Sequence, residues 1–428
     1  MEKYILNYIR EHSDDELMSH YIDLFKNDLD KLLYGNNTSF SGRNGFVSFS
    51  KYNMWKGEIR YILNKFTKSH QEESLNENSK NVLTTNAFGA DEDFRKYDIL
   101  LFSTDPRSLL RVINDKPFRD LRKVYASMLR SGSFHGMLKK ENLERLDFLQ
   151  DGIAKVLVKN KIKAFFTNND DAFWNKYLIE VCRKVGIPSF EFLHGFPAYT
   201  KDLNTRTDYL CVWGDKIKKN FIQNGFNGDR IFVTGTPHFS ISTKRSETLR
   251  NSFDDVLVAT SLATMYLQHG WIMDEYGDQN SSLLILYIYQ VEHVLRQLGV
   301  KHARLRPHPS VDKLWLSKYI DMDFYSLDYE SVNDSLNRST MVIGPHSTLM
   351  IDALCNGVNY YVYEPGENGV TIRGAKLAPP SDGRNEWVRV AQSEKELIEN
   401  IRGNNILDPR FLDGYLQPFS LTPIMDLF

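Results

Sequence analysis

Cysteine is scarce in this chain. Its 428 residues include three cysteines, Cys182, Cys211 and Cys355, which stand far apart in apolar surroundings. Neither a Cys-x-x-Cys pair nor a His/Cys cluster is present, and a structural zinc site or a disulfide framework would need such a pattern. We therefore expect reduced, buried cysteines in a reducing compartment, and no metal site.

Long hydrophobic runs and an excess of one charge are also missing. No apolar stretch approaches the roughly 18 residues of a membrane-spanning helix, and the first residues lack the apolar region of a secretory signal. The 53 basic and 55 acidic side chains give a net charge of −2, whereas nucleic-acid-binding proteins usually carry a basic excess. We expect a cytoplasmic protein that binds no nucleic acid, and peripheral contact with the inner membrane stays open.

The chain is long, and its aromatic content of 13% can fill large cores and line ring-stacking pockets. The chain is longer than a single hydrophobic core usually supports, so we expect two domains. Apolar residues recur at helical spacing over 1–35, which predicts a helix there. We expect a loop at 36–50 and a second helix over 52–70. The polar stretch 70–83 indicates a solvated connection.

From residue 97 onward, short apolar runs alternate with helical periodicity. The expected strands are 97–103, 164–167, 189–193, 209–213, 230–233, 255–260, 304–306, 324–327, 340–343 and 360–363. The expected helices are 106–130, 140–160, 172–185, 215–224, 281–298, 329–338, 348–356 and 393–402. Such alternation is typical of a parallel sheet with helices on both faces.

The polar stretch 234–254 indicates a boundary. We expect an α/β protein with two Rossmann-like, doubly wound domains, 1–240 and 253–402, joined near 240–252. Residues 403–428 form a C-terminal tail that packs back on the first domain. In such folds the ligand lies beyond the carboxyl ends of the strands, here in a cleft between the domains.

The segment Arg306-Pro307-His308-Pro309 is the first chemical candidate. A histidine held between two prolines cannot belong to a regular helix, so its backbone adopts extended or turn geometry. One interpretation is a loop histidine that caps a nearby helix. The other is a donor to a phosphate or leaving-group oxygen, which the neighbouring Arg304 and Arg306 favour.

The segment Gly344-Pro345-His346-Ser347-Thr348 follows a predicted strand and opens a predicted helix. Unpaired backbone N–H groups at such a helix start favour phosphate, and the hydroxyls of Ser347 and Thr348 add donors. Both residues are also ordinary N-caps. Asp352 in the first turn is placed to reach a ribose, and Glu364, after strand 360–363, is an alternative ribose partner.

Asp170 and Asp171 follow the strand 164–167, where the first domain would face the second. Adjacent carboxylates raise one another's pKa, which suits a general base for a sugar hydroxyl. The alternative is an N-cap for helix 172–185, and the two roles are compatible. His194, followed by Gly195, ends another strand and is either a turn histidine or a second candidate base.

Three further positions are suited to contacts with a phosphate or with another part of a donor substrate. Thr260 and Ser261 follow the first strand of the second domain, and Gly235 lies near the boundary. The glycine would allow close backbone approach.

The order of these segments resembles that of bacterial GT-B glycosyltransferases, most closely the sialyltransferases and polysialyltransferases that use CMP-activated sugars. Those enzymes carry an acidic pair followed by glycine, then a His-Pro pair, then a Ser/Thr segment. Asp170-Asp171, His308-Pro309 and Ser347-Thr348 occur here in that order. Ala172 stands where glycine is expected.

A second resemblance is to the CDP-glycerol glycerophosphotransferases of teichoic-acid synthesis. It is carried by His194-Gly195, by the segment 306–309 and by Ser347-Thr348 with Asp352. Together the two resemblances cover about residues 160–365, and residues 1–90 are interpreted as an added element on the acceptor side.

The first resemblance implies inverting, metal-independent transfer of a sialic-acid-like or Kdo-like sugar. The donor would be a CMP-sugar and the acceptor a hydroxyl of a surface oligosaccharide or glycolipid. Asp170 or Asp171 would accept the acceptor proton, with His194 as the alternative base. His308 would stabilise the departing nucleotide, and Ser347 and Thr348 would hold its phosphate. No cofactor is expected.

Two alternatives stay open. One is a transferase with another donor, CDP-glycerol or a UDP-sugar. The other is a sugar-nucleotide epimerase or a non-catalytic nucleotide-binding protein.

Overall fold

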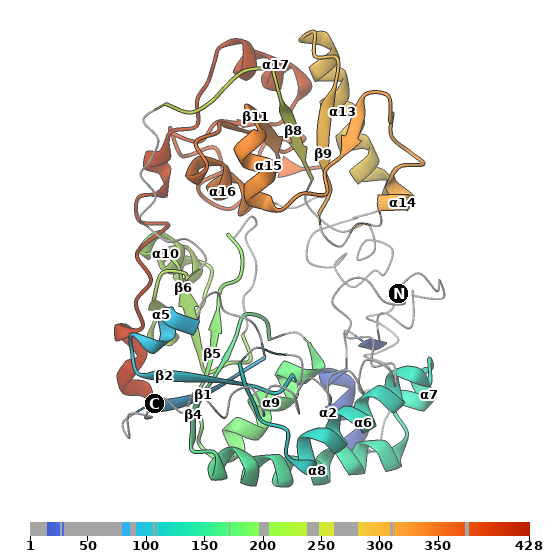
Figure 1. The fold of residues 1–428 in the computed structure, drawn as a ribbon, viewed down its shortest axis with the longest axis vertical. Coiled ribbons are helices and arrows are strands. Elements are labelled where there is room, and N and C mark those ends of the chain that lie inside the picture. Colours follow the sequence, from blue (N-terminus) through green and yellow to red (C-terminus); the bar gives the residue numbers. More distant parts are fainter. Residues whose placement is uncertain are drawn as a thin grey trace, which may run out of the picture.

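Two stacked α/β domains make up the described part of the chain (Figure 1). The computed structural model describes residues 15–25, 28–29, 79–85, 91–105, 108, 110–170, 172–196, 205–237, 248–260, 281–308, 311, 313–372 and 376–428. Of the predicted helix 1–35, the described part contains α2 (Glu16–Leu24), which Asp15 caps by accepting from the N–H groups of Leu17 and Met18. The predicted loop 36–50 and helix 52–70 lie outside the described residues.

The first domain is built on a seven-stranded parallel sheet of order β3-β2-β1-β4-β5-β6-β7. Its strands are β1 (Lys80–Thr84), β2 (Ile99–Ser103), β3 (Arg111–Val112), β4 (Ile162–Thr167), β5 (Ser189–Phe192), β6 (Tyr209–Val212) and β7 (Ile231–Val233). Its helices are α5 (Asp91–Arg95), α6 (Lys116–Arg130), α7 (Phe134–Met137), α8 (Lys140–Lys159), α9 (Phe173–Lys184) and α10 (Asp215–Gln223).

The prediction of a solvated connection over 70–83 is wrong for its last residues. Lys80–Thr84 form β1, which pairs in parallel with β2 on one side and β4 on the other. Val82 and Leu83 are fully buried. The strand has two large apolar residues among polar neighbours, so its sequence resembles a loop, and only the flanking strands reveal its place.

The second domain is built on a six-stranded parallel sheet of order β10-β9-β8-β11-β12-β15. Its strands are β8 (Val256–Ala259), β9 (Ala303–Arg306), β10 (Tyr325–Leu327), β11 (Met341–Gly344), β12 (Tyr360–Tyr363) and β15 (Val390–Ala391), and a small hairpin joins β13 (Gly366–Glu367) to β14 (Val370–Thr371). Its helices are α13 (Ser281–Gln297), α14 (Lys313–Leu316), α15 (Val332–Arg338), α16 (Leu349–Cys355) and α17 (Glu394–Arg402).

Both sheets have the strand order of a Rossmann fold. Counted within its own sheet, each follows the order 3-2-1-4-5-6, with β7 added at the edge of the first. The order reverses between β1 and β4 in the first sheet and between β8 and β11 in the second. The predicted pair of doubly wound domains, the GT-B arrangement, is therefore confirmed, and these reversal points are where such folds bind ligands.

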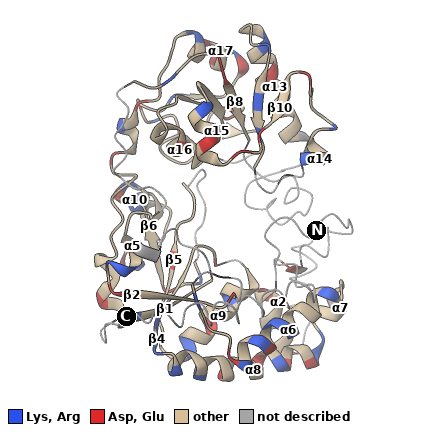
Figure 2. Ribbon diagram, viewed as in Figure 1, with Lys and Arg blue, Asp and Glu red and all other residues tan. Residues whose placement is uncertain are grey.

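Amphipathic helices cover the sheets. In α6 the buried residues include Phe118, Leu121, Tyr125 and Met128, which recur at the three- and four-residue spacing of one helix face. Figure 2 shows acidic and basic residues along the ribbons of α6 and α8, whereas the strands of the sheets carry few. Apolar burial between helix and sheet is the main force that holds each domain together.

The C-terminal residues run from the second domain back along the first (Figure 1). The N–H groups of Lys216, Gln417 and Ser420 donate to the carbonyls of Gly414, Trp213 and Thr234, each at 2.8 Å. Further on, the Lys80 ammonium donates to the carbonyls of Met425 and Phe428 at 2.7 and 2.6 Å.

Gly235 lies under this C-terminal segment. Its φ is +67°, and a Cβ here would stand 2.5 Å from the carbonyl oxygens of Gln417 and Pro418. A close backbone crossing therefore explains the glycine, and its contact with a phosphate stays a prediction.

Candidate functional site

The sequence candidates of the second domain gather at the carboxyl ends of its central strands. Thr260 follows β8, His308 follows β9 by two residues, Gly344 ends β11 and Glu364 follows β12. Because β8 and β11 are the strands between which the order reverses, Thr260 and the segment 344–348 flank the reversal point of this sheet. Ser261 and Pro309 lie outside the described residues.

Backbone bonds to neighbouring strands fix the position of His308. Its N–H donates to Thr260 Oγ1 at 3.2 Å, and the Thr260 N–H donates to the Arg306 carbonyl at the same distance. The His308 side chain remains exposed. Desolvation by nearby protein atoms lowers the pKa of its imidazole below 6.5, so the ring is neutral at pH 7 and offers one N–H donor.

Arg304 and Arg306 point to the same side of β9 and meet an acidic side chain there. Asp328 Oδ2 lies 3.1 Å from Arg306 Nη1 and 3.6 Å from Arg304 Nη1. Arg304 also donates to Asp255 Oδ1 at 2.7 Å and to the hydroxyls of Ser335 and Ser339. Arg304, 8% exposed at its side chain, is therefore a structural cation, whereas Arg306 is only half-buried.

Lys313 on α14 is a cation that sequence reasoning missed. Its ammonium donates to the Asp328 carbonyl at 2.9 Å. Desolvation, and secondly the positive charge of Arg306, lower its pKa. Asp255 and Asp328 offset Arg304 and Arg306, so Lys313 adds one positive charge in excess near β9, which favours a negatively charged ligand.

The turn 344–348 is held from behind by buried polar groups. Glu364 is fully buried, and its Oε1 accepts from the His346 N–H at 2.8 Å. The His346 ring, 1% exposed, bonds through Nδ1 to the Ser381 hydroxyl. Glu364 therefore supports the turn from behind, and its role as a ribose partner stays a prediction.

Gly344 leaves room for Tyr360. A Cβ at residue 344 would lie 2.0 Å from the Tyr360 hydroxyl, which donates to the Pro345 carbonyl at 2.7 Å and lies 3.4 Å from Ser347 Oγ. Asp352 is half-buried on α16. Thr348 occupies the N-cap position of α16, but its side chain makes no capping bond, so the side-chain capping alternative is wrong for Thr348.

Thr348 instead joins the two domains. Its Oγ1 accepts from the N–H of Phe196, four residues past β5 of the first domain, at 2.9 Å. The Phe196 ring stacks on the His346 ring with centroids 5.1 Å apart and planes inclined by 12°. Since an accepted bond leaves the hydroxyl proton of Thr348 able to donate, the contact leaves it able to serve a ligand as well.

Replacing Thr348 with valine tests this contact. The change keeps the side-chain shape but leaves the buried Phe196 N–H without its acceptor, so we expect the free energy of unfolding to fall by about 1–3 kcal/mol. Denaturant unfolding measures this loss. Thr348→Ser keeps the hydroxyl and serves as the matched control, and equal stability of the valine and serine variants would contradict the proposed bond.

In the first domain, Asp170 lies at the reversal point between β1 and β4. Its Oδ2 accepts from the Arg206 N–H at 2.5 Å, which ties the loop before β6 to the end of β4. The N-cap position of α9 is Ala172, whose side chain makes no capping bond, and the Ala172 N–H donates to Asn169 Oδ1 at 3.3 Å. The capping alternative is therefore wrong for Asp170, and Asp171 lies outside the described residues.

His194 follows β5 by two residues, and its side chain is exposed. It precedes Gly195 and Phe196, so it stands beside the interdomain contact. Phe196 and His346 were not identified from the sequence as contact residues, although His346 lies inside the segment 344–348 and Phe196 directly follows His194-Gly195.

The described residues contain neither a candidate metal centre nor a membrane-spanning helix. No three His, Cys, Asp or Glu side chains there gather in a group that could hold a metal ion. No helix in the described ranges has the length and apolar character needed to cross a membrane.

Comparison with known proteins gives likenesses in structure only. No family model and no curated protein matches the sequence. Among solved structures, the UDP-GlcNAc 2-epimerase of Methanocaldococcus jannaschii, in complex with UDP-GlcNAc and UDP, is 15% identical, covers 80% of this chain and 95% of its own, and has a TM-score of 0.43. A variant of the wall teichoic acid polymerase TagF is 14% identical over 87% of this chain and 95% of its own, with a TM-score of 0.40.

The lipopolysaccharide outer core galactosyltransferase WaaB in its apo form is 8% identical over 79% of this chain and 92% of its own, with a TM-score of 0.37. Likenesses at these scores say nothing about the activity of this chain.

Proposed function

We propose that this protein transfers a sugar from a nucleotide-activated donor to a hydroxyl of a glycan acceptor. One observation carries the proposal. The turn 344–348 at the reversal point of the second sheet contacts the segment after β5 of the first, through the Phe196–Thr348 bond and the Phe196–His346 stack. Ligands of doubly wound folds bind beyond the carboxyl ends of strands at such points.

The second domain is the proposed donor side. Arg306 and Lys313 favour an anionic ligand beside His308, as a nucleotide phosphate is. The N–H of the His308 imidazole and the hydroxyls of Thr260, Ser347 and Thr348 are the proposed donors to that phosphate. Preorganised donors at the leaving group are typically the largest contribution to such a reaction.

The proposed reaction is one displacement with inversion. Asp170 or Asp171, with His194 as the alternative, accepts the proton of the acceptor hydroxyl, and the acceptor oxygen forms a bond to the anomeric carbon. The bond between that carbon and the phosphate oxygen breaks, and the nucleotide leaves with the electron pair. Proximity and orientation of the two substrates contribute the rest of the rate enhancement.

The proposed donor is a CMP-sugar with a sialic-acid-like or Kdo-like sugar, and the acceptor is a surface oligosaccharide or glycolipid. Support comes from the order of Asp170-Asp171, His308-Pro309 and Ser347-Thr348, as in the sialyltransferase pattern. CDP-glycerol or a UDP-sugar as donor, epimerisation, and nucleotide binding without catalysis are the competing outcomes.

Thermal unfolding with CMP, CDP and UDP separates these outcomes. A nucleotide at 100 times its Kd stabilises the folded chain by about 2.7 kcal/mol, which raises Tm by several degrees. We expect the largest shift with CMP. A larger shift with CDP or UDP would indicate that the donor carries that nucleotide instead of CMP. No shift with any of the three would contradict the proposed function.

A further inference from the structure

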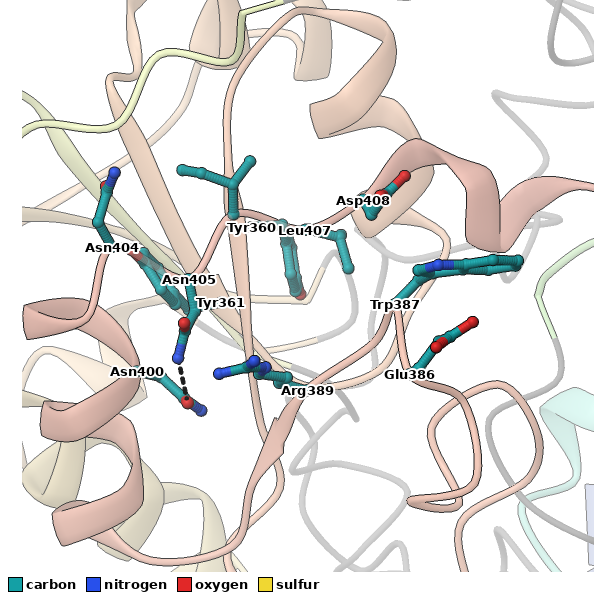
Figure 3. A pocket seen from close by; sticks show the side chains of 11 residues that line it. Tyr360, Tyr361, Glu386, Trp387, Arg389, Asn400, Asn404, Asn405, Leu407 and Asp408 are labelled. Atoms are coloured by element: carbon teal, nitrogen blue, oxygen red, sulfur yellow. Dashed lines mark hydrogen bonds between the residues drawn. The ribbon is translucent and has the colours of Figure 1, made fainter.

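The second domain contains a pocket whose lining includes none of the residues proposed for the donor (Figure 3). Its volume is about 230 Å³, several times the ~30 Å³ that one water molecule occupies in the liquid, so a small organic molecule fits. Tyr360 and Tyr361 at the start of β12, the segment 386–389 before β15 and the segment 404–408 after α17 line it.

The pocket sits at the opposite ends of the strands from the candidate site. Thr260, His308 and the turn 344–348 follow the carboxyl ends of β8, β9 and β11, whereas the pocket borders the amino ends of β12 and β15. None of the residues proposed for the donor lines it. A ligand here would therefore occupy another site, which adjoins the turn 344–348 only through Tyr360, whose hydroxyl donates to the Pro345 carbonyl.

Asparagine amides form one side of the pocket. Figure 3 shows Asn400, Asn404 and Asn405 on this side. Asn405 Nδ2 donates to Asn400 Oδ1 at 2.8 Å, and Asn404 Oδ1 accepts from Asn251 Nδ2 at 2.6 Å. Each amide has one more polar atom, so the three side chains offer both donors and acceptors to a ligand.

The other side carries an aromatic ring and a carboxylate. Figure 3 shows Trp387 and Glu386 there, with the Arg389 side chain between the two sides. The Arg410 guanidinium lies over the Trp387 ring at 5.3 Å from its centroid, which holds the ring in place. An aromatic ring presents apolar surface to the C–H groups of a ligand, and side-chain amides and charges bind hydroxyls.

The charges around the pocket balance. Asp408 pairs with Arg410, which leaves Arg389 and Glu386 as one charge of each sign. A strongly anionic ligand would meet Glu386 as well as Arg389, so the charge pattern favours an uncharged, hydroxyl-rich molecule over a phosphate.

We propose that this pocket binds one uncharged pyranose unit of a carbohydrate. Its size, its amide groups, its aromatic ring and its balanced charge all fit a ring with several hydroxyls and an apolar face. The site is independent of the proposed transfer reaction. If that reaction uses a glycan acceptor, the pocket would bind a sugar unit of the acceptor away from the reacting hydroxyl.

Ligand-observed NMR on the full chain tests whether the pocket binds a sugar. The neutral probes are methyl α-D-glucopyranoside, methyl α-D-galactopyranoside and N-acetylglucosamine. The anionic probes are glucuronate and inorganic phosphate. Arg389→Ala and Glu386→Gln change exposed pocket residues. Arg384→Ala is the matched control, because Arg384 is 90% exposed at its side chain and lies outside the pocket, two residues before the segment 386–389.

We expect saturable binding of at least one neutral probe, weakened about tenfold or more by Arg389→Ala and by Glu386→Gln and unchanged by Arg384→Ala. The thermal shift that CMP causes should be the same in all three variants. Any of three results would overturn the proposal. These are no saturable binding of a neutral probe, tighter binding of glucuronate or phosphate than of the neutral probes, and binding that neither pocket variant weakens. These outcomes do not depend on whether CMP binds.

Discussion

Replacing His308 with alanine is expected to lower kcat/KM for sugar transfer about 100-fold or more, with little change in stability. The substitution removes the imidazole proposed to donate to the leaving phosphate, and loss of one such donor typically costs 10²- to 10³-fold. The His308 backbone bond to Thr260 Oγ1 survives it. Because the side chain is exposed, its loss leaves no buried cavity. Steady-state kinetics and a denaturant unfolding curve measure the two effects.

His302→Ala is the control, since His302 is an exposed histidine of the same domain. It should leave kcat/KM unchanged. A His308→Ala enzyme that retains activity within about threefold of the wild type would remove His308 from the site, whereas a large loss of stability would assign it a structural role.

The pH dependence gives an independent check on the same side chain. Desolvation holds the His308 pKa below 6.5, and a bound phosphate would raise it, because the negative charge favours the imidazolium. Binding then takes up a proton. Affinity for CMP should therefore increase as the pH falls from 8 toward the pKa of the free imidazole, and His308→Ala should weaken that dependence.

Replacing Asp328 with alanine is expected to lower the free energy of unfolding by about 3–5 kcal/mol, because it leaves the buried Arg304 and its neighbour Arg306 without a shared counter-charge. The Asp328 side chain is 1% exposed and lies within 3.6 Å of both guanidinium groups. Since Arg306 leads directly into the Pro307–His308 turn, nucleotide binding should weaken too. Denaturant unfolding and calorimetric titration with CMP measure the two effects.

Asp328→Asn separates charge from shape. Burial by itself raises the pKa of this carboxyl, but hydrogen bonds from Ser335, the Glu330 N–H and Arg306 outweigh it and hold the pKa below 3.8. A carboxylate with a lowered folded-state pKa contributes stability above its unfolded pKa and loses it as the pH falls through the folded value. The wild type should therefore lose stability below about pH 4, and Asp328→Asn should do so less steeply.

The exposed Asp323 provides the comparison. Asp323→Asn should change stability by less than about 0.5 kcal/mol. If Asp328→Ala is no more destabilising than Asp323→Asn, the buried ion pairs contribute nothing to the second domain.

The alternation of strands and helices from residue 97 onward could be predicted because each buried strand is a short apolar run with its own turn signals. β4 through β12 agree with their predicted ranges to within two residues. β1 could not be found this way, because Lys80 and Asn81 are polar and its burial comes from strands distant in sequence. β3 and β15, with two residues each, are too short to show a period.

The positions of the candidate site residues within the fold could be predicted from the sequence. Thr260, His308 and the turn 344–348 follow central strands, and the end of a strand is visible in the sequence. The residues that these side chains contact could not be predicted. Glu364 supports His346 from another strand, and Phe196 reaches Thr348 across 152 positions of the chain. Such pairings depend on tertiary packing, so no local spacing encodes them.

The central claim is that a nucleotide-activated donor binds at the reversal point of the second sheet, facing the segment after β5. A crystal structure of the full chain soaked with CMP tests it most directly. We expect the phosphate to lie within hydrogen-bond distance of the His308 imidazole and of the turn 344–348. A nucleotide bound elsewhere, or none at a concentration that saturates the thermal shift, would contradict it.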